Sequence, residues 1–334
     1  MVQIEYDMYL APDTPLDSDG TVLDWSNVYK FDDRDRLFLY SFSGWGMPGI
    51  EYITQQGPFE HGSTVLDYRL QPRVIQLVHR RLGYCRNDYW SNRGLLIDAL
   101  RPNRQLANSF SPGRLRKILS NGDVRDIEVF IEQGPIFNPR EISNWDEYAF
   151  QENLRFIAHN PIIFDPAVQS AVWVLSSLEN LIFYEAVNWE NRLVFEGDDL
   201  DSGGIWFGKS SIGDTLDVNY TGTWLSYPTI YITGPIFMPH IYNNTTSEKV
   251  ALDYDVAVGE TVTINLEYGN KTVVNNAGTN LIGTVTTDSD LATFHIAPDP
   301  EAVNGINQLL VTGDDAEIGQ TEIRIEWHTN YIGI

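Results

Sequence analysis

The sequence is poor in cysteine and in basic residues. Cys85 is the only cysteine among 334 residues, which excludes an internal disulfide framework and a metal site built from several cysteines. Lysine and arginine total 22 against 46 aspartates and glutamates, a formal net charge of −24, which argues against general attraction to nucleic acid or to anionic lipid. The sequence also lacks a run of about 18 apolar residues and a basic-then-apolar secretion signal at its N-terminus. We therefore expect a protein made in a cytoplasm and not inserted in a membrane.

The composition nevertheless supports well-formed hydrophobic cores. Aromatic residues make up 12% of the chain and charged residues only 20%, so the chain is not a disordered acidic polymer. Its length allows two domains or one large all-β unit.

Positive charge is concentrated in one segment. Residues 65–125 carry 12 basic and 4 acidic side chains, whereas 1–64 and 126–334 are both acidic. A nucleic-acid patch and simple solvated or intrachain charge are alternatives, but the segment has no interleaved exposed aromatics and no recognition helix. We expect it to face acidic surface of a neighbouring subunit. The candidate interface residues are Arg69, Arg73, Arg80, Arg81 and Arg93.

Strand patterns dominate the first half of the chain. Residues 65–82 alternate in hydrophobicity and are expected to form one long strand bent at Pro72. The pattern of 89–100 predicts a helix whose apolar face includes Ile97. Asn121-Gly122, between two apolar runs, predicts a hairpin with positive φ at both residues.

The second half changes character. Short strands there are separated by Thr, Asn, Gly and Asp turns at a spacing of about 8 to 12 residues, which favours a β-sandwich. We predict a mainly β protein of two β-sandwich domains, 1–164 and 165–334. The last strand, 321–334, can belong to the second domain or pack back on the first.

The motifs that suggest chemistry lack their structural context. Residues 203–210 read GGIWFGKS, a literal phosphate-loop match, but the sequence after them is typical of turns and strands rather than of a helix. We expect a hairpin or loop there, with Lys209 in solvent. The acidic loop at 15–20 misses the end positions of a calcium loop, and the one at 197–204 matches no better. The six histidines are scattered singly and no G-x-S-x-G turn occurs, so we expect no catalytic residues, no cofactor and no metal.

Several segments, taken in order, resemble the distal tail proteins of long-tailed bacteriophages, in the siphovirus-type tail component family. In the first half they are 46–62 (GMPGIEYITQQGPFEHG), 67–77 with the following helix, 122–140 and 154–166; in the second half they are 222–252, 258–274 and 321–334. None of these segments is a catalytic signature, so the likeness rests on their order along the chain and on their residue patterns.

The resemblance implies a structural hub. It implies an N-terminal β-sandwich with a long β-hairpin and one helix, placed in a ring, expected to be a hexamer, through which DNA passes. It also implies a galectin-like or carbohydrate-module-like C-terminal sandwich that projects outward. The implied partners are the tail tube protein, tail-tip and tape-measure proteins, and adsorption proteins. The protein would be assembled in the host cytoplasm and reside in the tail tip of the virion.

Two other classes of function stay open. One is a carbohydrate-binding adhesion module, with Trp224 and Tyr227 as candidate sugar contacts on a loop before Pro228. The other is a β-sandwich glycosidase, because the separation of a catalytic carboxylate pair is set by the fold and not by sequence spacing.

Overall fold

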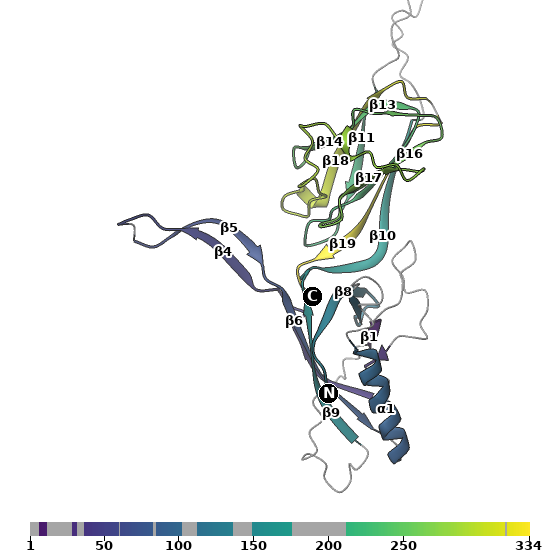
Figure 1. Ribbon diagram of the computed structural model, residues 1–334. Coiled ribbons are helices and arrows are strands. Elements are labelled where there is room, and N and C mark those ends of the chain that lie inside the picture. Colours follow the sequence, from purple (N-terminus) through teal and green to yellow (C-terminus); the bar gives the residue numbers. More distant parts are fainter. Residues whose placement is uncertain are drawn as a thin grey trace, which may run out of the picture. The chain divides into compact units, whose positions relative to one another are not determined.

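The described residues fold into two compact units. The computed structural model describes residues 7–11, 29–31, 37–59, 61–82, 85–101, 112–135, 149–175, 212–317 and 319–334. Unit 1 comprises Met1–Val168, Gly222–Trp224 and His328–Ile334, and unit 2 comprises Gln169–Thr221 and Leu225–Trp327. The protein is mainly β (Figure 1).

The elements of unit 1 are β-strands with one α-helix among its described residues. They are β1 (Asp7–Ala11), β2 (Tyr29–Lys30), β3 (Leu37–Ser43), β4 (Ile50–Gln55), β5 (Thr64–Leu70), β6 (Arg73–Leu82), α1 (Arg86–Ala99), β7 (Gly113–Ile118), β8 (Val124–Gln133), β9 (Ala149–Ala158) and the first part of β10 (Ile163–Val174). The elements of unit 2 are the rest of β10, β11 (Ile212–Asn219), β12 (Thr229–Thr233), β13 (Ile236–Asn243), β14 (Glu248–Ala251), β15 (Asp255–Val256), β16 (Thr261–Asn265), β17 (Thr272–Asn275), β18 (Ile306–Asp314), β19 (Glu322–Tyr331) and the short 3₁₀ turns Ile282–Thr284 and Val303–Gly305. The last residues of β19 belong to unit 1.

Strand β8 holds the sheets of unit 1 together. Its first part pairs with β7, which pairs with β1, and its second part pairs with β9, which pairs with β6 and through it with β3. The core between these strands includes the fully buried Leu115, Ile127 and Phe156. Leu96 on α1 and Leu100, the residue at its C-cap, lie one helical turn apart and pack into this core.

Unit 2 is a β-sandwich. One sheet has the order β17-β16-β12-β19 and the other β11-β18-β13-β14. Within the first sheet Ile264, Ile230 and Ile325 lie directly opposite one another, so all three point to the same face, and all three are buried. The next residue along β12, Tyr231, points to the other face and is only half-buried. Alternation of this kind explains why one face of the sheet builds the core.

Three local expectations need correction. The run 65–82 forms two strands, because the strand is interrupted at Gln71-Pro72. The two strands have different partners: β5 pairs with β4, whereas β6 pairs with β3 and β9. In the β7–β8 turn only Gly122 has positive φ, since the Asn121 side chain accepts a hydrogen bond from the Asp123 N–H instead. Ile97 is exposed, because the buried face of α1 is formed by Leu96 and Leu100.

Candidate functional site

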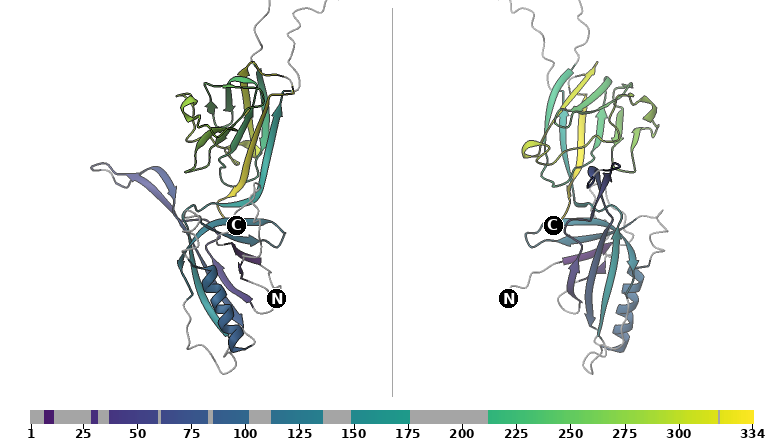
Figure 2. Two further views of the ribbon diagram at one scale, coloured as in Figure 1. Left: turned by 45° about the vertical axis from the view of Figure 1, so that its right-hand side comes forward. Right: turned by 90° about the vertical axis from the view of Figure 1, so that its left-hand side faces the viewer.

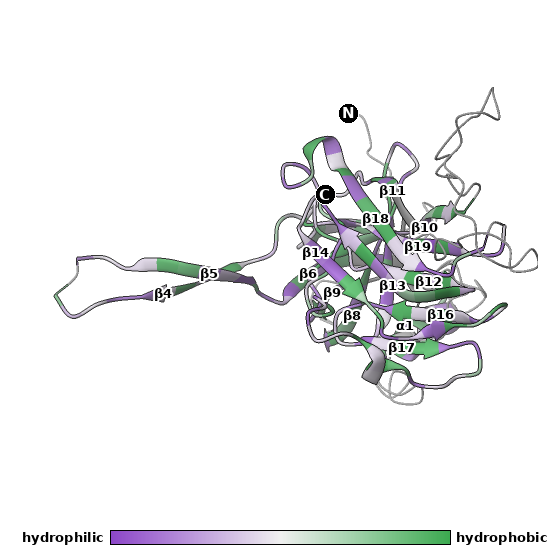
Figure 3. Ribbon diagram, turned by 90° about the horizontal axis from the view of Figure 1, so that it is seen from above, coloured by the Kyte–Doolittle hydropathy of each residue, from purple (hydrophilic) through white to green (hydrophobic). Residues whose placement is uncertain are grey.

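Strands β4 and β5 form an arm that projects from the sheets of unit 1 (Figures 1 and 2). Every residue of β4 after Ile50 and every residue of β5 before Leu70 is exposed. Among the described residues of these strands, large apolar side chains are nevertheless common, and Figure 3 shows hydrophobic residues along β5. At the tip of the arm Phe59 is fully exposed, with a φ of 75°. A two-stranded ribbon in water is marginally stable, so this arm has the character of a contact element.

The arm has two chemically different faces. Side chains alternate along β4, and residues directly opposite on β5 share their face. The first face, named the Tyr face, has the exposed pair Tyr52 and Tyr68, which lie opposite each other. Its other members are Ile50, Leu70, Thr54 and Val65.

The second face, named the ionic face, is mostly polar. Glu51 and Arg69 lie opposite each other, and the Arg69 guanidinium donates two hydrogen bonds of 2.9 Å to the Glu51 carboxylate. This hydrogen bond and the charge of Arg69 lower the pKa of Glu51. The other members of the ionic face are Ile53, Asp67, Gln55 and Thr64. The two faces therefore differ in chemistry: the Tyr face can be covered by apolar surface, whereas covering the ionic face would take charged groups out of water.

Arg73 secures the root of the arm. Its buried guanidinium donates hydrogen bonds to the carbonyls of Pro161 (2.9 Å), Gly44 (2.8 Å) and Ile332 (2.8 Å), and also to that of Gly46. Burial lowers the pKa of Arg73 to about 10, so the side chain stays charged at neutral pH. Gly44 has a φ of 93°, and a Cβ there would lie 2.1 Å from the Val74 carbonyl oxygen, so only glycine lets the chain pass so close to β6.

A second buried charge cluster lies where β7 pairs with β8. Asp126 is fully buried and accepts two hydrogen bonds of 2.8 Å from Arg116, whose side chain is 8% exposed. The guanidinium of Arg114 lies 3.6 Å from the same carboxylate. Pairing of buried charges is what makes their burial tolerable. This cluster belongs to the interior of unit 1 and not to its surface.

The helix α1 presents an exposed stripe, named the α1 stripe. Trp90, Arg93 and Ile97 follow one another at helical spacing, and Arg101 lies just beyond the C-terminal end of α1. Trp90 and Ile97 are exposed, and the Arg93 guanidinium lies 5.1 Å from the centroid of the Trp90 ring. The stripe therefore combines apolar surface with positive charge.

The five predicted interface arginines do not have one common environment. Arg69 lies on the ionic face of the arm and Arg93 on the α1 stripe. The expectation that Arg73 lies at a subunit interface is corrected, because its buried guanidinium donates hydrogen bonds to carbonyls of its own chain and cannot face a neighbouring subunit. Arg80 is half-buried on β6, and the side chain of Arg81 lies outside what the structure describes.

The candidate sugar contacts belong to different units. Trp224 is part of unit 1, where its backbone N–H donates to the Asn330 carbonyl at 3.2 Å. Tyr227 is part of unit 2, and the Lys271 ammonium lies 4.8 Å from the centroid of its ring. Burial raises the pKa of Tyr227, with smaller contributions from Glu248 and Tyr268. The phosphate-loop match at 203–210 and the acidic loops at 15–20 and 197–204 lie outside the described residues.

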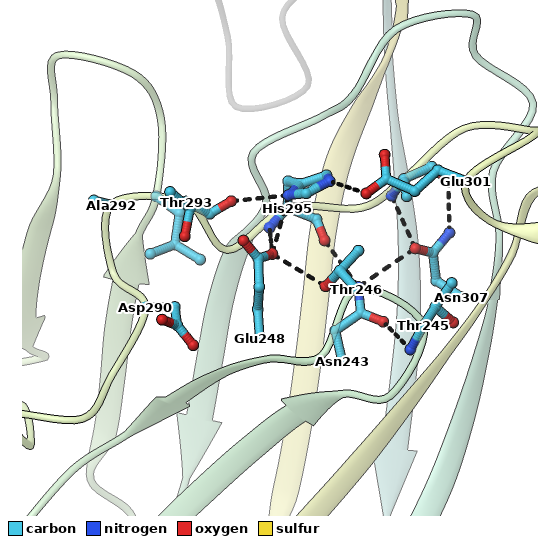
Figure 4. A network of polar contacts seen from close by, with 12 residues as sticks. Asn243, Thr245, Thr246, Glu248, Asp290, Ala292, Thr293, His295, Glu301 and Asn307 are labelled. Carbon is cyan, nitrogen blue, oxygen red and sulfur yellow. Dashed lines mark hydrogen bonds and ion pairs between the residues drawn. The ribbon is translucent and has the colours of Figure 1, made fainter. Parts of the chain in front are cut away.

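One polar network of unit 2 is bonded mainly within itself (Figure 4). His295 Nδ1 lies 3.0 Å from Glu248 Oε2, and His295 Nε2 lies 3.4 Å from Glu301 Oε1. The buried Asn243 donates to the His295 carbonyl at 2.9 Å, and the buried Asn307 donates to the Ala297 carbonyl at 2.9 Å. We interpret this network as structural, because its groups bind one another and hold the loops around β13, β14 and β18. In the part of the chain that the structure describes, no group of three metal-ligating side chains occurs and no helix is long and apolar enough to cross a membrane.

An exposed ion pair in unit 2 yields a pH-dependent prediction. The hydrogen bond from Lys249 is the main cause, with Thr286 next, of a pKa of about 2 for Asp288. Because this pKa lies below the usual value near 3.9, the pair stabilises the fold above about pH 4, and this contribution is lost as the pH falls toward 2. We expect Lys249→Met to raise the pKa of Asp288, as measured by carboxyl NMR titration.

A matched control is Lys271→Met. Its ammonium donates to the carbonyls of Leu266, Leu291 and Ala292 rather than to a carboxylate, so its loss leaves the pKa of Asp288 unchanged. An unchanged pKa of Asp288 in Lys249→Met would contradict the assignment.

A comparison with known protein families finds a match for part of the chain. Residues 221–331 match the family model described as the siphovirus-type tail component, C-terminal domain. This part of the chain is therefore similar to the C-terminal domain of siphovirus-type tail components. No curated protein matches the chain.

The whole chain has the fold of a distal tail protein. The Dit protein of phage SPP1, described as a paradigm of the hub of the adsorption apparatus in phages that infect Gram-positive bacteria, matches with a TM-score of 0.60 and 11% identity over 98% of this chain and 99% of that chain. Chains of the phage P2 baseplate in its activated conformation with Ca and with Sr match with TM-scores of 0.46 and 0.45 at 10% identity, covering 97% and 96% of this chain and 98% of each of theirs. The resemblance to siphovirus distal tail proteins is thus confirmed, for the C-terminal domain by the family and for the whole chain by the fold.

The Tyr face was not predicted from the sequence. Residues 50–55 and 64–70 are two alternating runs joined by a glycine-containing turn, and this is the signal that could have revealed the arm. Reading 65–82 as one strand concealed it, because Tyr68 was assigned to the same strand as the buried residues of β6.

Proposed function

We propose that this protein is the hub of a siphovirus tail tip, a structural and non-catalytic part of the virion. Copies of unit 1 close into a ring, expected to be a hexamer, that joins the tail tube to the tail-tip and tape-measure proteins and lets DNA pass through its lumen. Unit 2 offers a platform for adsorption proteins. The match of 221–331 to a tail component and the Dit fold support this proposal.

The observation that carries the proposal is the exposed arm. It presents Tyr52, Tyr68 and Val65 at half or more of their full exposure in the single chain. Apolar surface of this kind marks a protein interface, and another copy of the chain is a partner that could cover it. A chain with net charge −24 repels its copies, so apolar contacts and the basic segment 65–125 must offset that repulsion.

The test is the mass of the purified full-length chain. We expect native mass spectrometry to give a closed oligomer, with six copies as the predicted number, and electron microscopy to show a ring with a central opening. Salt should weaken the ring only partly, because exposed ion pairs contribute about 0 to 1 kcal/mol each and apolar contacts dominate. A monomer at every concentration up to the solubility limit would contradict the proposal.

The two alternatives gain no support from the described residues. A sugar platform needs an open aromatic face, whereas the Tyr227 ring lies under the Lys271 ammonium and the Tyr231 ring lies 4.4 Å from the Arg324 guanidinium carbon. For a glycosidase, one of the two buried described carboxylates, Asp126, is neutralised by Arg116, so it and the other, Glu152, do not form a free carboxylate pair.

A further inference from the structure

We infer that residues 330–334, named the strap, close over the root of the arm, residues 44–49 and 71–73, and hold it in place. The strap continues β19, whose earlier residues belong to unit 2, but the strap itself belongs to unit 1. Unit 1 is thus built from stretches of chain that precede and follow the sequence of unit 2. The inference concerns contacts within one chain and rests on the proposed function only for its consequence in assembly.

Two hydrogen bonds join the strap to the root. The Ile334 N–H donates to the Trp45 carbonyl at 3.0 Å, and the Ile332 carbonyl accepts from the Arg73 guanidinium at 2.8 Å. Trp45 and Arg73 are each 3% exposed, so both residues lie in the interior of unit 1. The strap therefore supplies hydrogen-bond partners to two buried residues.

The middle of the strap lies directly against the backbone of the root. A Cβ added to Gly333 would lie 2.8 Å from the Gly46 carbonyl carbon and 3.0 Å from the Met47 nitrogen. These distances are too short for van der Waals contact, so this close approach requires glycine at position 333. The reverse does not hold, since a Cβ added to Gly46 would meet no atom within 4 Å. A side chain is thus excluded from one side of the contact and tolerated on the other.

The strap is also held by residues outside the root. The Thr223 N–H donates to the Asn330 carbonyl at 2.9 Å, and the Ile332 N–H donates to the Thr223 hydroxyl at 3.1 Å. The Arg125 guanidinium carbon lies 4.1 Å from the centroid of the Tyr331 ring, and this ring packs against the core of unit 1. The strap is therefore an ordered element of unit 1, with contacts along its whole length.

The strap reaches the root late in synthesis. Ile332 lies 259 positions after Arg73, and all of unit 2 is translated between them. Before the strap closes, the buried Arg73 guanidinium lacks one of its carbonyl partners and the Trp45 carbonyl lacks the Ile334 donor, which is costly for buried polar groups. The root is therefore fixed only in a chain that has completed unit 2. Copies whose synthesis stops earlier carry a loose arm and stay out of the proposed ring.

Hydrogen exchange of the full-length chain tests whether the strap holds the root. Gly333→Ala places a Cβ against the Gly46 backbone and should lift the strap, whereas Gly46→Ala is the matched control from the other side of the same contact. We expect amide exchange, followed by mass spectrometry, to become at least tenfold faster at residues 44–49 and 71–73 in Gly333→Ala. In Gly46→Ala the exchange should stay unchanged.

A second variant removes the same contacts without introducing a clash. A chain lacking residues 332–334 loses both hydrogen bonds to the root and should show the same faster exchange; circular dichroism confirms that each variant folds. Native mass spectrometry should show at least tenfold weaker assembly in Gly333→Ala and in the shortened chain, but not in Gly46→Ala.

The outcomes separate the strap from the ring. Exchange that becomes faster only within the strap, or in neither variant, would overturn the inference, as would an equal effect of Gly46→Ala. A wild-type monomer would overturn the proposed function and the consequence for assembly, whereas exchange at the root still decides whether the strap holds the arm.

Discussion

Replacing Asp126 by alanine is expected to lower the free energy of unfolding by about 3 to 5 kcal/mol, because it leaves a buried arginine without its counter-charge. Asp126 is fully buried, and Arg116 binds it through two hydrogen bonds of 2.8 Å. The nearby Arg114, whose pKa is already lowered by burial, also loses a favourable charge interaction when the carboxylate is removed. Urea unfolding of the full chain, followed by tryptophan fluorescence, measures the change.

The arm provides a matched control for Asp126. Glu51 makes the same two-bond contact with Arg69, at 2.9 Å, but both side chains lie in water. Glu51→Ala is therefore expected to leave the unfolding midpoint almost unchanged. Equal effects of Asp126→Ala and Glu51→Ala would show that burial does not determine the strength of these pairs.

Replacing Arg73 by methionine is expected to cost about 3 to 5 kcal/mol, since hydrogen bonds from a charged donor are worth about 1.5 to 3 kcal/mol each and their loss leaves buried carbonyls without donors. The guanidinium binds carbonyls from three separate parts of unit 1, at Gly44, Pro161 and Ile332. Loss of these bonds frees the root of the arm, so the variant should also assemble poorly. The measurements are urea unfolding and native mass spectrometry.

Arg73→Lys separates charge from geometry. Lysine keeps the charge but lacks the planar fork that reaches carbonyls on several sides, so it should recover only part of the lost stability. Full recovery with lysine would mean that the charge alone matters. An unchanged stability in Arg73→Met would contradict the assigned role of these hydrogen bonds.

Much of unit 2 could be predicted from the sequence. In residues 229–233 Tyr231 stands between Ile230 and Ile232, so strand alternation makes it face opposite to them; the structure buries both isoleucines and leaves Tyr231 half-buried. This works because side chains in a strand alternate with a strict period of two, so burial is determined locally once one face meets the core.

Unit 1 was harder to predict from the sequence, because the contacts that decide which residues are buried join residues far apart in the chain. Arg73 pairs with a carbonyl 259 positions away, and no local pattern distinguishes it from the exposed Arg69 four residues earlier. The break at Pro72 separates a strand in water from a strand in the core, although the two have similar alternation. The basic segment therefore contains both interior and surface arginines.

The sequence by itself determined that this protein is mainly β, that it resembles siphovirus distal tail proteins, and that it lacks the common catalytic motifs. These conclusions depend on composition, strand periodicity and the order of segments, which are local or additive properties. Only the tertiary structure decided that β4 and β5 leave the core as an arm, that its Tyr and ionic faces differ, and that Arg73 and Asp126 are interior while Arg69 is not. The physical reason is that burial of a charge depends on which distant carbonyls and carboxylates surround it, and this is known only once the sheets are packed.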